Sequence, residues 1–331
     1  MSDILYKTNK NSQDLMQGMT DINDEIEREE EESEEPYMRQ SVHHVSPSKI
    51  ADQFWCEMQL HLKLRLGMEP TEEMIKGSEI HRNLEEELGP VIQVEVTTYE
   101  DSIIVYILQM YTKLELLEKL GLTRELPVIG QLQDFDCIGI IDQIEIETNE
   151  DGEEVLVITD YKTRKSRRAP TYEQKRRNRI QMQVYWHLLN NLISGNYTQE
   201  MYKRYFEMPE KIEPSKELLK QLPKDSKQIL KKYPPYELLN KVFTIFRELP
   251  TLSQKLVAKY LHQEDQTEVH VDRTFFHEDS FEVDMDWALS YWKGERTASD
   301  SPQNWMCNYC QFSDNCSFFL KRYLKTAIPK Q

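Results

Sequence analysis

The chain has 331 residues, 39% of them hydrophobic, and a formal net charge of −17 at pH 7. That length fits one large domain or two ordinary ones, with enough apolar residues for a packed core. No run of about 18 or more apolar residues occurs, which excludes a membrane-spanning helix, and the first twenty residues lack both arginine and an apolar stretch, which argues against a transit or secretory signal.

The N-terminal segment is strongly acidic. Residues 21–35 carry ten acidic side chains and one basic one, Arg28, so this tract supplies about half of the net charge. Blocks of like charge repel one another and have little apolar surface to bury. We therefore predict a disordered acidic tail over residues 1–40, followed by a single domain over residues 41–325. A protein partner that binds the tail is the alternative interpretation.

Helices are predicted directly after the tail. Ser46 is a capping residue and Pro47 fits the first helical position, so a helix is expected through residue 66, and Gly89 ends a second helix over residues 72–88. The other expected elements are strands over 91–98 and 103–108, a short helix over 114–120, a hairpin over 135–163, a helix over 172–193, a mainly helical insert over about 195–265, a strand over 269–275 and a helix over 285–293. Strands between groups of helices predict an α/β or α+β fold.

The hairpin brings two carboxylates together. Residues 135–146 and 153–163 have strand character, and the loop between them ends in Gly152, which suits the left-handed backbone that a three-residue hairpin loop needs. This loop sets the register so that Asp142 lies directly opposite Asp160, on the face that also carries isoleucine and leucine side chains.

Lys162 follows two residues after Asp160 on that face. Two carboxylates and an ammonium group on an apolar face are costly unless a cation compensates them. Carboxylates hold hard divalent cations, and an ammonium group can orient water or stabilise charge on an attacked phosphate. An Asp-x-Lys triplet alone more often forms an ordinary surface ion pair, but the apolar face and the second aspartate, Asp142, favour a metal-dependent active site.

The cysteines divide into a group of four and one alone. Cys307, Cys310 and Cys316 form a C-x2-C-x5-C cluster near the C-terminus, and Cys56 lies far upstream. Cys137 falls in the first hairpin strand, where it is expected to be a small buried hydrophobe. Four thiolates hold either zinc or an iron–sulphur cluster, and spacing alone does not decide between them. Either group would tie the N-terminal helix to the C-terminal segment.

Two pairs of residues lie four positions apart on predicted helices. His81 shares a helix face with Glu85, and Gln181 shares one with Tyr185, with Arg177 one turn earlier. Taken singly, each pair is more often ordinary helix surface or core than part of a site.

In combination, these motifs resemble a known family. In chain order they are Gly77-x3-His81, Gly139-x2-Asp142, Asp160-x-Lys162 and Gln181-x3-Tyr185. Their order is similar to that in the RecB-type PD-(D/E)XK nucleases, and the bracket of Cys56 and the C-terminal cysteines is similar to that of the iron–sulphur members. The eukaryotic exonuclease V family fits best, because its members share the long helical insert and a Trp-x-Gly-x-Arg element, here residues 292–296. The resemblance covers about residues 45–320.

The resemblance implies a fold and a site. The fold is a PD-(D/E)XK restriction-endonuclease-like core, with a central mixed sheet flanked by helices and a four-cysteine cluster at residues 307–316 joined to Cys56. The implied ligands of Mg²⁺ or Mn²⁺ are His81, Asp142 and Asp160, helped by the Tyr161 carbonyl. Lys162 is the implied catalytic lysine. Many relatives have glutamate where this chain has Asp160, and Glu85 as an extra ligand stays open.

The resemblance also implies a [4Fe–4S] cluster rather than zinc, and single-stranded DNA as the substrate. Residues 164–179 hold eight basic side chains and one acidic one, directly after the catalytic strand. We expect this basic segment to contact phosphates, unless it is a nuclear-import signal or a solvated helix face. The expected DNA-binding residues are Gln181, Tyr185, Arg177, Arg164 and Lys165.

The sequence thus predicts a monomeric, metal-dependent exonuclease that cuts single-stranded DNA into short oligonucleotides in DNA repair. The nucleus is the expected compartment, with the mitochondrion and cytoplasm as alternatives. The alternative functions are a non-catalytic nucleic-acid-binding protein with a structural zinc or iron–sulphur site, and a CRISPR spacer-acquisition nuclease. The intact Asp142, Asp160 and Lys162 disfavour the first, and the long helical insert disfavours the second.

Overall fold

The structure is a computed structural model that describes residues 5–8, 44–300 and 303–321. Of the predicted acidic tail, it describes only strand β1 (Leu5–Thr8), which pairs in parallel with β3 (Val91–Val94). The rest of that tail, including residues 21–35, lies outside the described residues.

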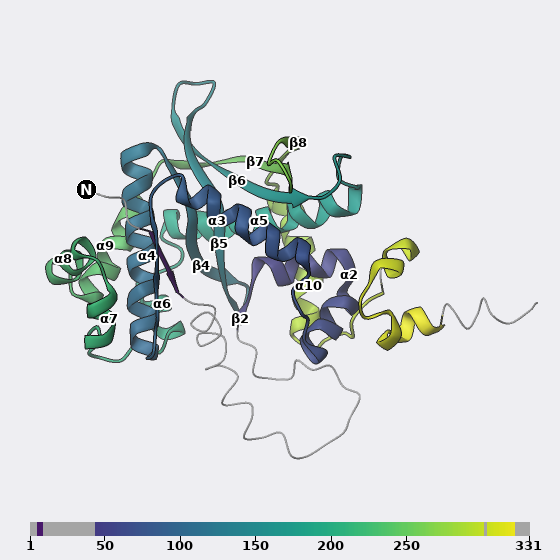
Figure 1. Cartoon of the computed structure of the whole chain (residues 1–331), viewed down its shortest axis with the longest axis horizontal. Coiled ribbons are helices and arrows are strands. Elements are labelled where there is room, and N and C mark those ends of the chain that lie inside the picture. Colours follow the sequence, from purple (N-terminus) through teal and green to yellow (C-terminus); the bar gives the residue numbers. More distant parts are fainter. Residues whose placement is uncertain (1–4, 9–43, 301–302, 322–331) are drawn as a thin grey trace, which may run out of the picture.

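A six-stranded mixed sheet forms the centre of the molecule (Figure 1). Its strands are β2 (His44–Val45), β4 (Leu122–Leu132), β5 (Phe135–Thr148), β6 (Glu154–Arg164), β7 (Thr251–His262) and β8 (Glu268–Phe275). Strand β4 takes one edge of β5, whereas β6 and β2 share its other edge, and β7 and β8 continue the sheet beyond β6. Only β2–β5 and β6–β7 are parallel pairs in this sheet, so the predicted mixed sheet is confirmed.

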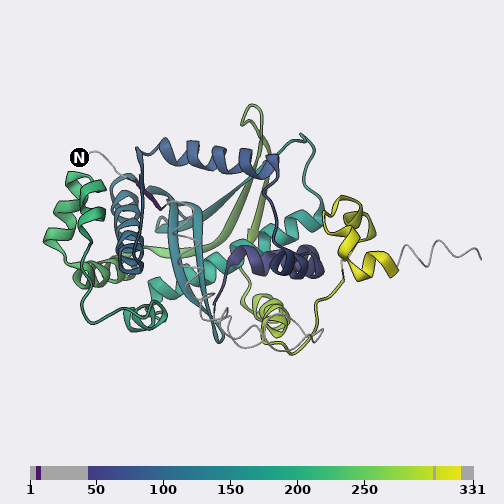
Figure 2. The ribbon, with the colours of Figure 1, turned by 60° about the horizontal axis from the view of Figure 1, so that its bottom comes forward.

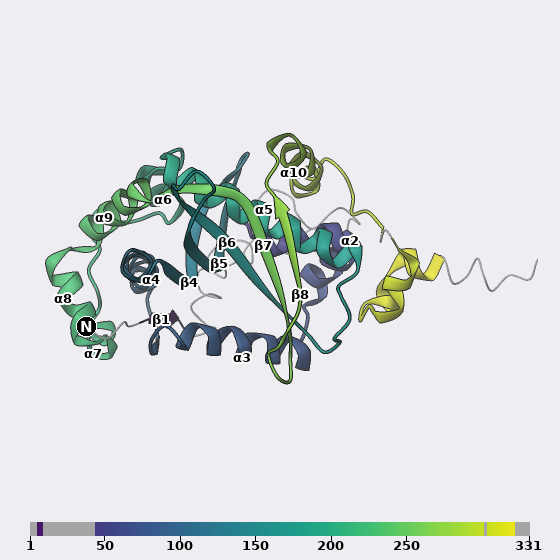
Figure 3. The same cartoon turned by 90° about the horizontal axis from the view of Figure 1, so that it is seen from above.

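Helices flank this sheet on both sides, as predicted. They are α2 (Pro47–Leu66), α3 (Glu72–Glu86), α4 (Tyr99–Leu120), α5 (Tyr172–Ser194), α6 (Gln199–Tyr205), α7 (Lys216–Gln221), α8 (Lys224–Lys232), α9 (Pro235–Glu248) and α10 (Glu278–Trp292), with the short 3-10 turns η1 (Asn304–Tyr309) and η2 (Ser313–Asn315). Helix α3 lies on one side of the strands and α5 on the other (Figure 3). Helices α7 and α8 lie at the opposite end of the molecule from the C-terminal cysteine segment, which is beside α2 (Figure 2).

The predicted hairpin is confirmed in its register. Strands β5 and β6 pair antiparallel with Ile144 opposite Ile158 and Thr148 opposite Glu154, as the loop geometry requires. Gly152 in the loop has φ +81°, the left-handed backbone for which glycine was expected. The helix starting at Pro47 is also confirmed, because the Ser46 side chain accepts a hydrogen bond from the Lys49 N–H.

The prediction of a strand over residues 103–108 and a separate helix over 114–120 was wrong. Both belong to α4, which Thr98 caps and Gly121, with φ +68°, ends. Every residue from Ile103 to Leu108 is buried. A helix that is buried all round has no polar stripe, so its sequence shows a run of apolar residues that is easily mistaken for a strand.

The mainly helical insert predicted over residues 195–265 was wrong at its end. Helices α6 to α9 occupy residues 199–248, but residues 251–262 form β7, between β6 and β8. Short apolar runs such as Leu256 to Ala258 do not distinguish a buried strand from a helix. Strand β4 was not predicted at all.

No helix in the described part of the chain combines the length and apolar character that crossing a bilayer requires.

Candidate active site

The two aspartates lie where the central hairpin opens. The β5–β6 ladder ends at the pair Gln143–Thr159, and Asp142 and Asp160 are the next residues on each strand. At this point a side chain replaces the backbone as acceptor, since Asp142 Oδ2 accepts a hydrogen bond of 2.7 Å from the Tyr161 N–H. The sequence therefore places both carboxylates where the strands separate and leave room for another group.

Asp160 is buried, with 1% of its surface exposed. Its Oδ1 accepts a hydrogen bond from Lys162 Nζ at 2.9 Å, whereas its buried Oδ2 has no hydrogen-bond partner among the described residues. Burial raises the pKa of Asp160 to about 6, partly offset by Lys162 and reinforced by Asp142. Burial likewise raises the pKa of Asp142. Such carboxylates are costly without a cation, and the free oxygen gives one a ligand.

Helix α3 brings His81 to these carboxylates. A Cβ on Gly77 would lie 3.0 Å from Thr163 Oγ1, so the glycine lets α3 approach β6 closely. His81 Nε2 lies 3.1 Å from the Tyr161 carbonyl oxygen, and Nδ1 lies 3.6 Å from Asp142 Oδ1. That carbonyl is thus a hydrogen-bond partner that orients the ring, an arrangement typical of metal-binding histidines.

Glu125 is a site residue that the sequence reasoning missed. Its Oε1 lies 3.4 Å from His81 Nδ1, and one ligand atom each from His81, Glu125 and Asp142 lie within 4.8 Å of one another. Burial lowers the pKa of His81, but the carboxylates of Glu125 and Asp142 outweigh it and raise the pKa to about 9. These three residues form a cluster that fits a metal ion.

The backbone at Glu125 is unusual for a strand. Its φ is +53°, and the β4–β5 ladder skips it between the pairs Arg124–Gln143 and Leu126–Ile141. A left-handed conformation costs about 1–2 kcal/mol in a residue with a side chain. Gln133, Glu207 and Gln266 also have a positive φ, so it is the position of this strained residue beside His81 and Asp142 that indicates a functional role.

Lys162 is held by a chain of hydrogen bonds that crosses to α5 and α2. Its Nζ donates to Gln181 Oε1 at 3.0 Å, and Gln181 Nε2 donates to Tyr185 Oη and Ser48 Oγ, both at 3.1 Å. Burial raises the pKa of Tyr185 well above its usual value, so the phenol stays protonated. Gln181 and Tyr185, expected to bind DNA, thus lie within the site and fix the lysine.

Gly139 fits the close approach of these elements. A Cβ at this position would lie 2.6 Å from Tyr185 Cε1 and 2.7 Å from Pro47 Cγ, distances that packed atoms do not reach. The glycine of the Gly-x2-Asp motif is therefore explained by packing of α5 and the start of α2 against β5.

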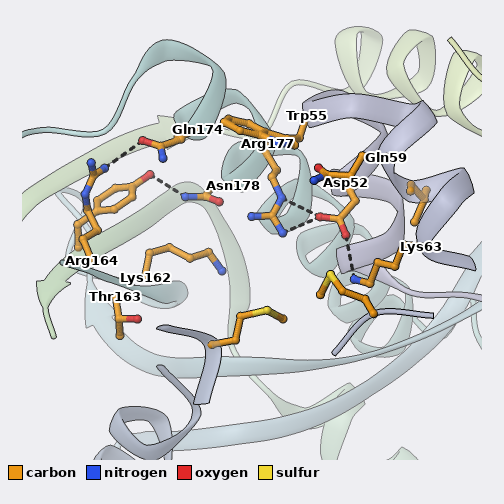
Figure 4. A pocket seen from close by; sticks show the side chains of 14 residues that line it. Asp52, Trp55, Gln59, Lys63, Lys162, Thr163, Arg164, Gln174, Arg177 and Asn178 are labelled. Carbon is orange, nitrogen blue, oxygen red and sulfur yellow. Dashed lines mark hydrogen bonds and ion pairs between the residues drawn. The ribbon is translucent and has the colours of Figure 1, made fainter. Parts of the chain in front are cut away.

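A cavity of about 360 Å³ opens beside Lys162 and extends along α2 (Figure 4). Arg164 and Arg177, two of the predicted DNA-binding residues, line it. Lys165 is outside the cavity and pairs with Glu73 on the surface.

Glu85 is not part of the cluster of His81, Glu125 and Asp142 and lies in a buried ion pair. Its Oε1 accepts a hydrogen bond of 2.6 Å from Lys113 Nζ, and both side chains are 1% exposed. This contact gives Glu85 a structural role between α3 and α4.

The four grouped cysteines are brought to one pocket. Cys56, Cys307, Cys310 and Cys316 all line it. Cys56 has φ −162° and ψ 106°, which breaks the helical geometry of α2 at this residue. Burial raises the pKa of the Cys56 thiol to about 12, so the free thiol keeps its proton at neutral pH and a bound metal would displace it.

Cys137 is separate from this pocket. It is fully buried in β5, as expected for a small hydrophobe.

The Trp-x-Gly-x-Arg element clamps α2 on either side of Cys56. Trp292 Nε1 donates to Gln53 Oε1 at 2.7 Å, and Arg296 donates two hydrogen bonds to the fully buried Glu57. The Ser299 N–H donates a third at 2.6 Å. The motif thus holds the helix segment that presents Cys56.

Comparisons with known proteins relate most of the chain to a family. The family model for exonuclease V, described as a 5′ deoxyribonuclease, matches residues 33–155, 147–241 and 226–319. Exonuclease V of zebrafish (Danio rerio) is 30% identical over 305 residues, which are 88% of this chain and 75% of that protein. The crystal structure of SSO0001 resembles the chain with a TM-score of 0.40 and 12% identity, covering 93% of this chain and 96% of that one. Likeness at that level adds nothing to the assignment.

Proposed function

The chain belongs to the exonuclease V family of DNA exonucleases, and from this we propose that it is a Mg²⁺-dependent exonuclease that degrades single-stranded DNA from a free end. The observation that carries the proposal is the meeting of Asp142, Asp160 and Lys162 where β5 and β6 separate. Free single-stranded ends arise when DNA is repaired, so we place the reaction in genome maintenance.

The residues fit a hard divalent cation. Oxygen ligands with one imidazole suit Mg²⁺ or Mn²⁺, and His81, Glu125 and Asp142 supply such a set. Asp160 is not among these three residues, but its partnerless Oδ2 is available as a further ligand. When bound, such an ion lowers the pKa of water and offsets charge on a phosphate.

The chain supplies the remaining chemistry. Gln181 and Asp160 hold the Lys162 ammonium group in place, so it can orient water or stabilise negative charge that develops on the phosphate. Arg164 and Arg177 line the neighbouring cavity, where they can bind the DNA backbone.

The test compares Asp160→Asn with Asp151→Asn, a change in the exposed tip of the same hairpin. End-labelled linear single strands, circular single strands and duplexes are incubated with each protein, with and without Mg²⁺. We expect the wild type and Asp151→Asn to degrade only linear single strands, and only with Mg²⁺. Asp160→Asn should bind the strand and leave it uncut. Full cleavage by Asp160→Asn, or cleavage of circles, would contradict the proposal.

We also propose that the four grouped cysteines hold a structural [4Fe–4S] cluster. Support comes from their shared pocket and from the broken helix that presents Cys56. A brown protein whose broad visible absorption is bleached by dithionite is the expected result, whereas a colourless protein that contains zinc would overturn it. Cys307→Ala should lose the metal and stability, and Cys137→Ala should keep the metal.

A further inference from the structure

The cavity beside Lys162 has walls from five elements, with Met74 of α3 and Tyr260 of β7 completing those supplied by α2, β6 and α5. Helix α2 supplies Asp52, Trp55, Gln59 and Lys63, strand β6 supplies residues 162–164, and α5 supplies Gln174, Arg177 and Asn178 (Figure 4). Its volume of about 360 Å³ is within the range of roughly 300–1,000 Å³ typical of small-ligand sites. The cavity beside the catalytic lysine therefore has room for one nucleotide of a DNA strand.

One wall presents a fixed positive group. Arg177 Nε and Nη2 lie 2.8 Å and 2.6 Å from Asp52 Oδ1, and Lys63 Nζ lies 3.5 Å from Asp52 Oδ2. The third guanidinium nitrogen of Arg177 points towards Lys162 (Figure 4). A guanidinium group held in this way is preorganised to bind a phosphate, because it loses little side-chain freedom on binding.

The end of the cavity near the cysteine pocket is aromatic. Trp55 lines the cavity and also the pocket of the four cysteines, as does Gln59. Trp305, two residues before Cys307, packs edge-on against Trp55 with ring centroids 5.9 Å apart. Gln59 Nε2 lies 3.5 Å from Cys310 Sγ. The cysteine segment thus packs against the indole of Trp55, which is at the same time part of the cavity wall.

We infer that this cavity binds the nucleotide adjoining the scissile phosphate, with its base stacked on Trp55 and its phosphate held by Arg177. The inference rests on the proposed function and deepens it. Base–aromatic stacking needs an open base face, which a base inside a duplex does not offer. A stacking residue in the cavity that opens beside the catalytic lysine therefore selects single strands whatever their sequence.

The first test replaces Trp55 in the holoprotein. The substrate is a single strand that carries 2-aminopurine next to the labelled end, because stacking quenches its fluorescence. Trp55→Ala is expected to raise KM about tenfold, with kcat changed much less, and to remove the quenching. Trp55→Phe should keep a KM close to that of the wild type and most of the quenching. The control is Phe275→Ala, an aromatic that is 54% exposed on β8, outside both the cavity and the basic segment of residues 164–179.

The visible absorption and melting temperature of each variant show whether the cysteine site is intact. Trp55→Ala with an intact cysteine site, wild-type KM and wild-type quenching would overturn the inference. If Trp55→Ala loses the metal, Trp55→Leu decides, because it keeps an apolar side chain without an aromatic ring. A loss of quenching in Trp55→Leu with the metal retained supports stacking, and wild-type quenching overturns it. A wild-type protein that cleaves no single strand would instead overturn the proposed function.

The second test addresses the phosphate contact. The affinity of the holoprotein for an unmodified single strand is measured against salt concentration, with Ca²⁺ replacing Mg²⁺. Arg177→Ala should reduce the salt slope by about 0.7, the value for one phosphate contact on a single strand. Arg204→Ala is the matched control, since Arg204 is exposed on α6, outside both the basic segment of residues 164–179 and the cavity. Equal slopes for the two variants would contradict the assignment of Arg177.

Discussion

The strongest single prediction concerns Glu125, which the strained backbone places beside His81 and Asp142. Glu125→Gln removes the charge and keeps the size of the side chain. Glu125→Gly removes the side chain and relieves the left-handed backbone. If Glu125 helps to hold the metal, both variants should lose activity, and they should differ in stability.

The size of the effect follows from His81. The rise in its pKa from 6.5 to about 9 corresponds to about 3 kcal/mol of attraction to the two carboxylates, net of burial. If Glu125 supplies about half, it contributes about 1.5 kcal/mol towards a single positive charge, or about tenfold in affinity. A divalent cation is attracted more strongly, so Glu125→Gln should raise the Mg²⁺ concentration needed for half-maximal activity by at least about tenfold.

Activity should fall in Glu125→Gly, but the relieved backbone should favour the folded state. Relief of the φ of +53° is favourable by about 1–2 kcal/mol, against about 0.5–1 kcal/mol for the extra freedom of glycine in the unfolded chain. Above about pH 9, where His81 is neutral and its attraction to Glu125 no longer contributes, the metal-free variant should therefore be as stable as the wild type or up to about 1.5 kcal/mol more stable.

The assay measures initial rates against Mg²⁺ concentration, together with melting temperatures in chelator. Glu154→Gln, an exposed change at the start of β6, is the matched control and should behave as the wild type. A wild-type Mg²⁺ dependence in Glu125→Gln would refute the reasoning, as would a large loss of stability in Glu125→Gly.

Three further predictions follow from the site and its supports. His81 and Asp160 bind their protons more tightly when folded, with pKa values of about 9 and 6, so the melting temperature without metal should fall as pH rises from about 4 to 6 and again from about 6.5 to 9. Excess Mg²⁺ should reduce that fall, and an equal fall with Mg²⁺ would count against these ligands. Gly139→Ala should destabilise the fold by about 1–3 kcal/mol and lower kcat, because the added Cβ displaces the neighbouring tyrosine; unchanged melting would disprove this packing. Arg296→Ala leaves the buried Glu57 charge unpaired and should cost about 3–5 kcal/mol, with recovery in the double variant that also carries Glu57→Gln.

The central hairpin could be predicted because local chemistry determines it. The left-handed position at Gly152 fixes the loop, and the alternation of apolar residues then fixes which side chains of β5 and β6 face one another. Once the register is known, the meeting of Asp142 and Asp160 requires no further information about the fold.

Glu125 could not be found in the same way. Its position depends on β4, whose partner is β5, and on a left-handed residue that interrupts their pairing. A glutamate gives no local signal for that conformation, which the surrounding structure imposes. The sequence does hold one clue to strand β4, since Arg124 and Glu125 precede an apolar run in a segment whose composition is typical of strands.

One helix connects three parts of the proposed machinery. Helix α2 supplies Ser48 to the hydrogen bonds that fix the lysine, Asp52 and Trp55 to the cavity, and Cys56 and Glu57 to the cysteine pocket and its clamp. Because Trp55 adjoins Cys56, the cysteine that breaks the helix also sets the position of the cavity wall. Disturbing the cysteine site should therefore weaken substrate binding first, and affect the distant carboxylates on β5 and β6 only when the helix as a whole comes loose.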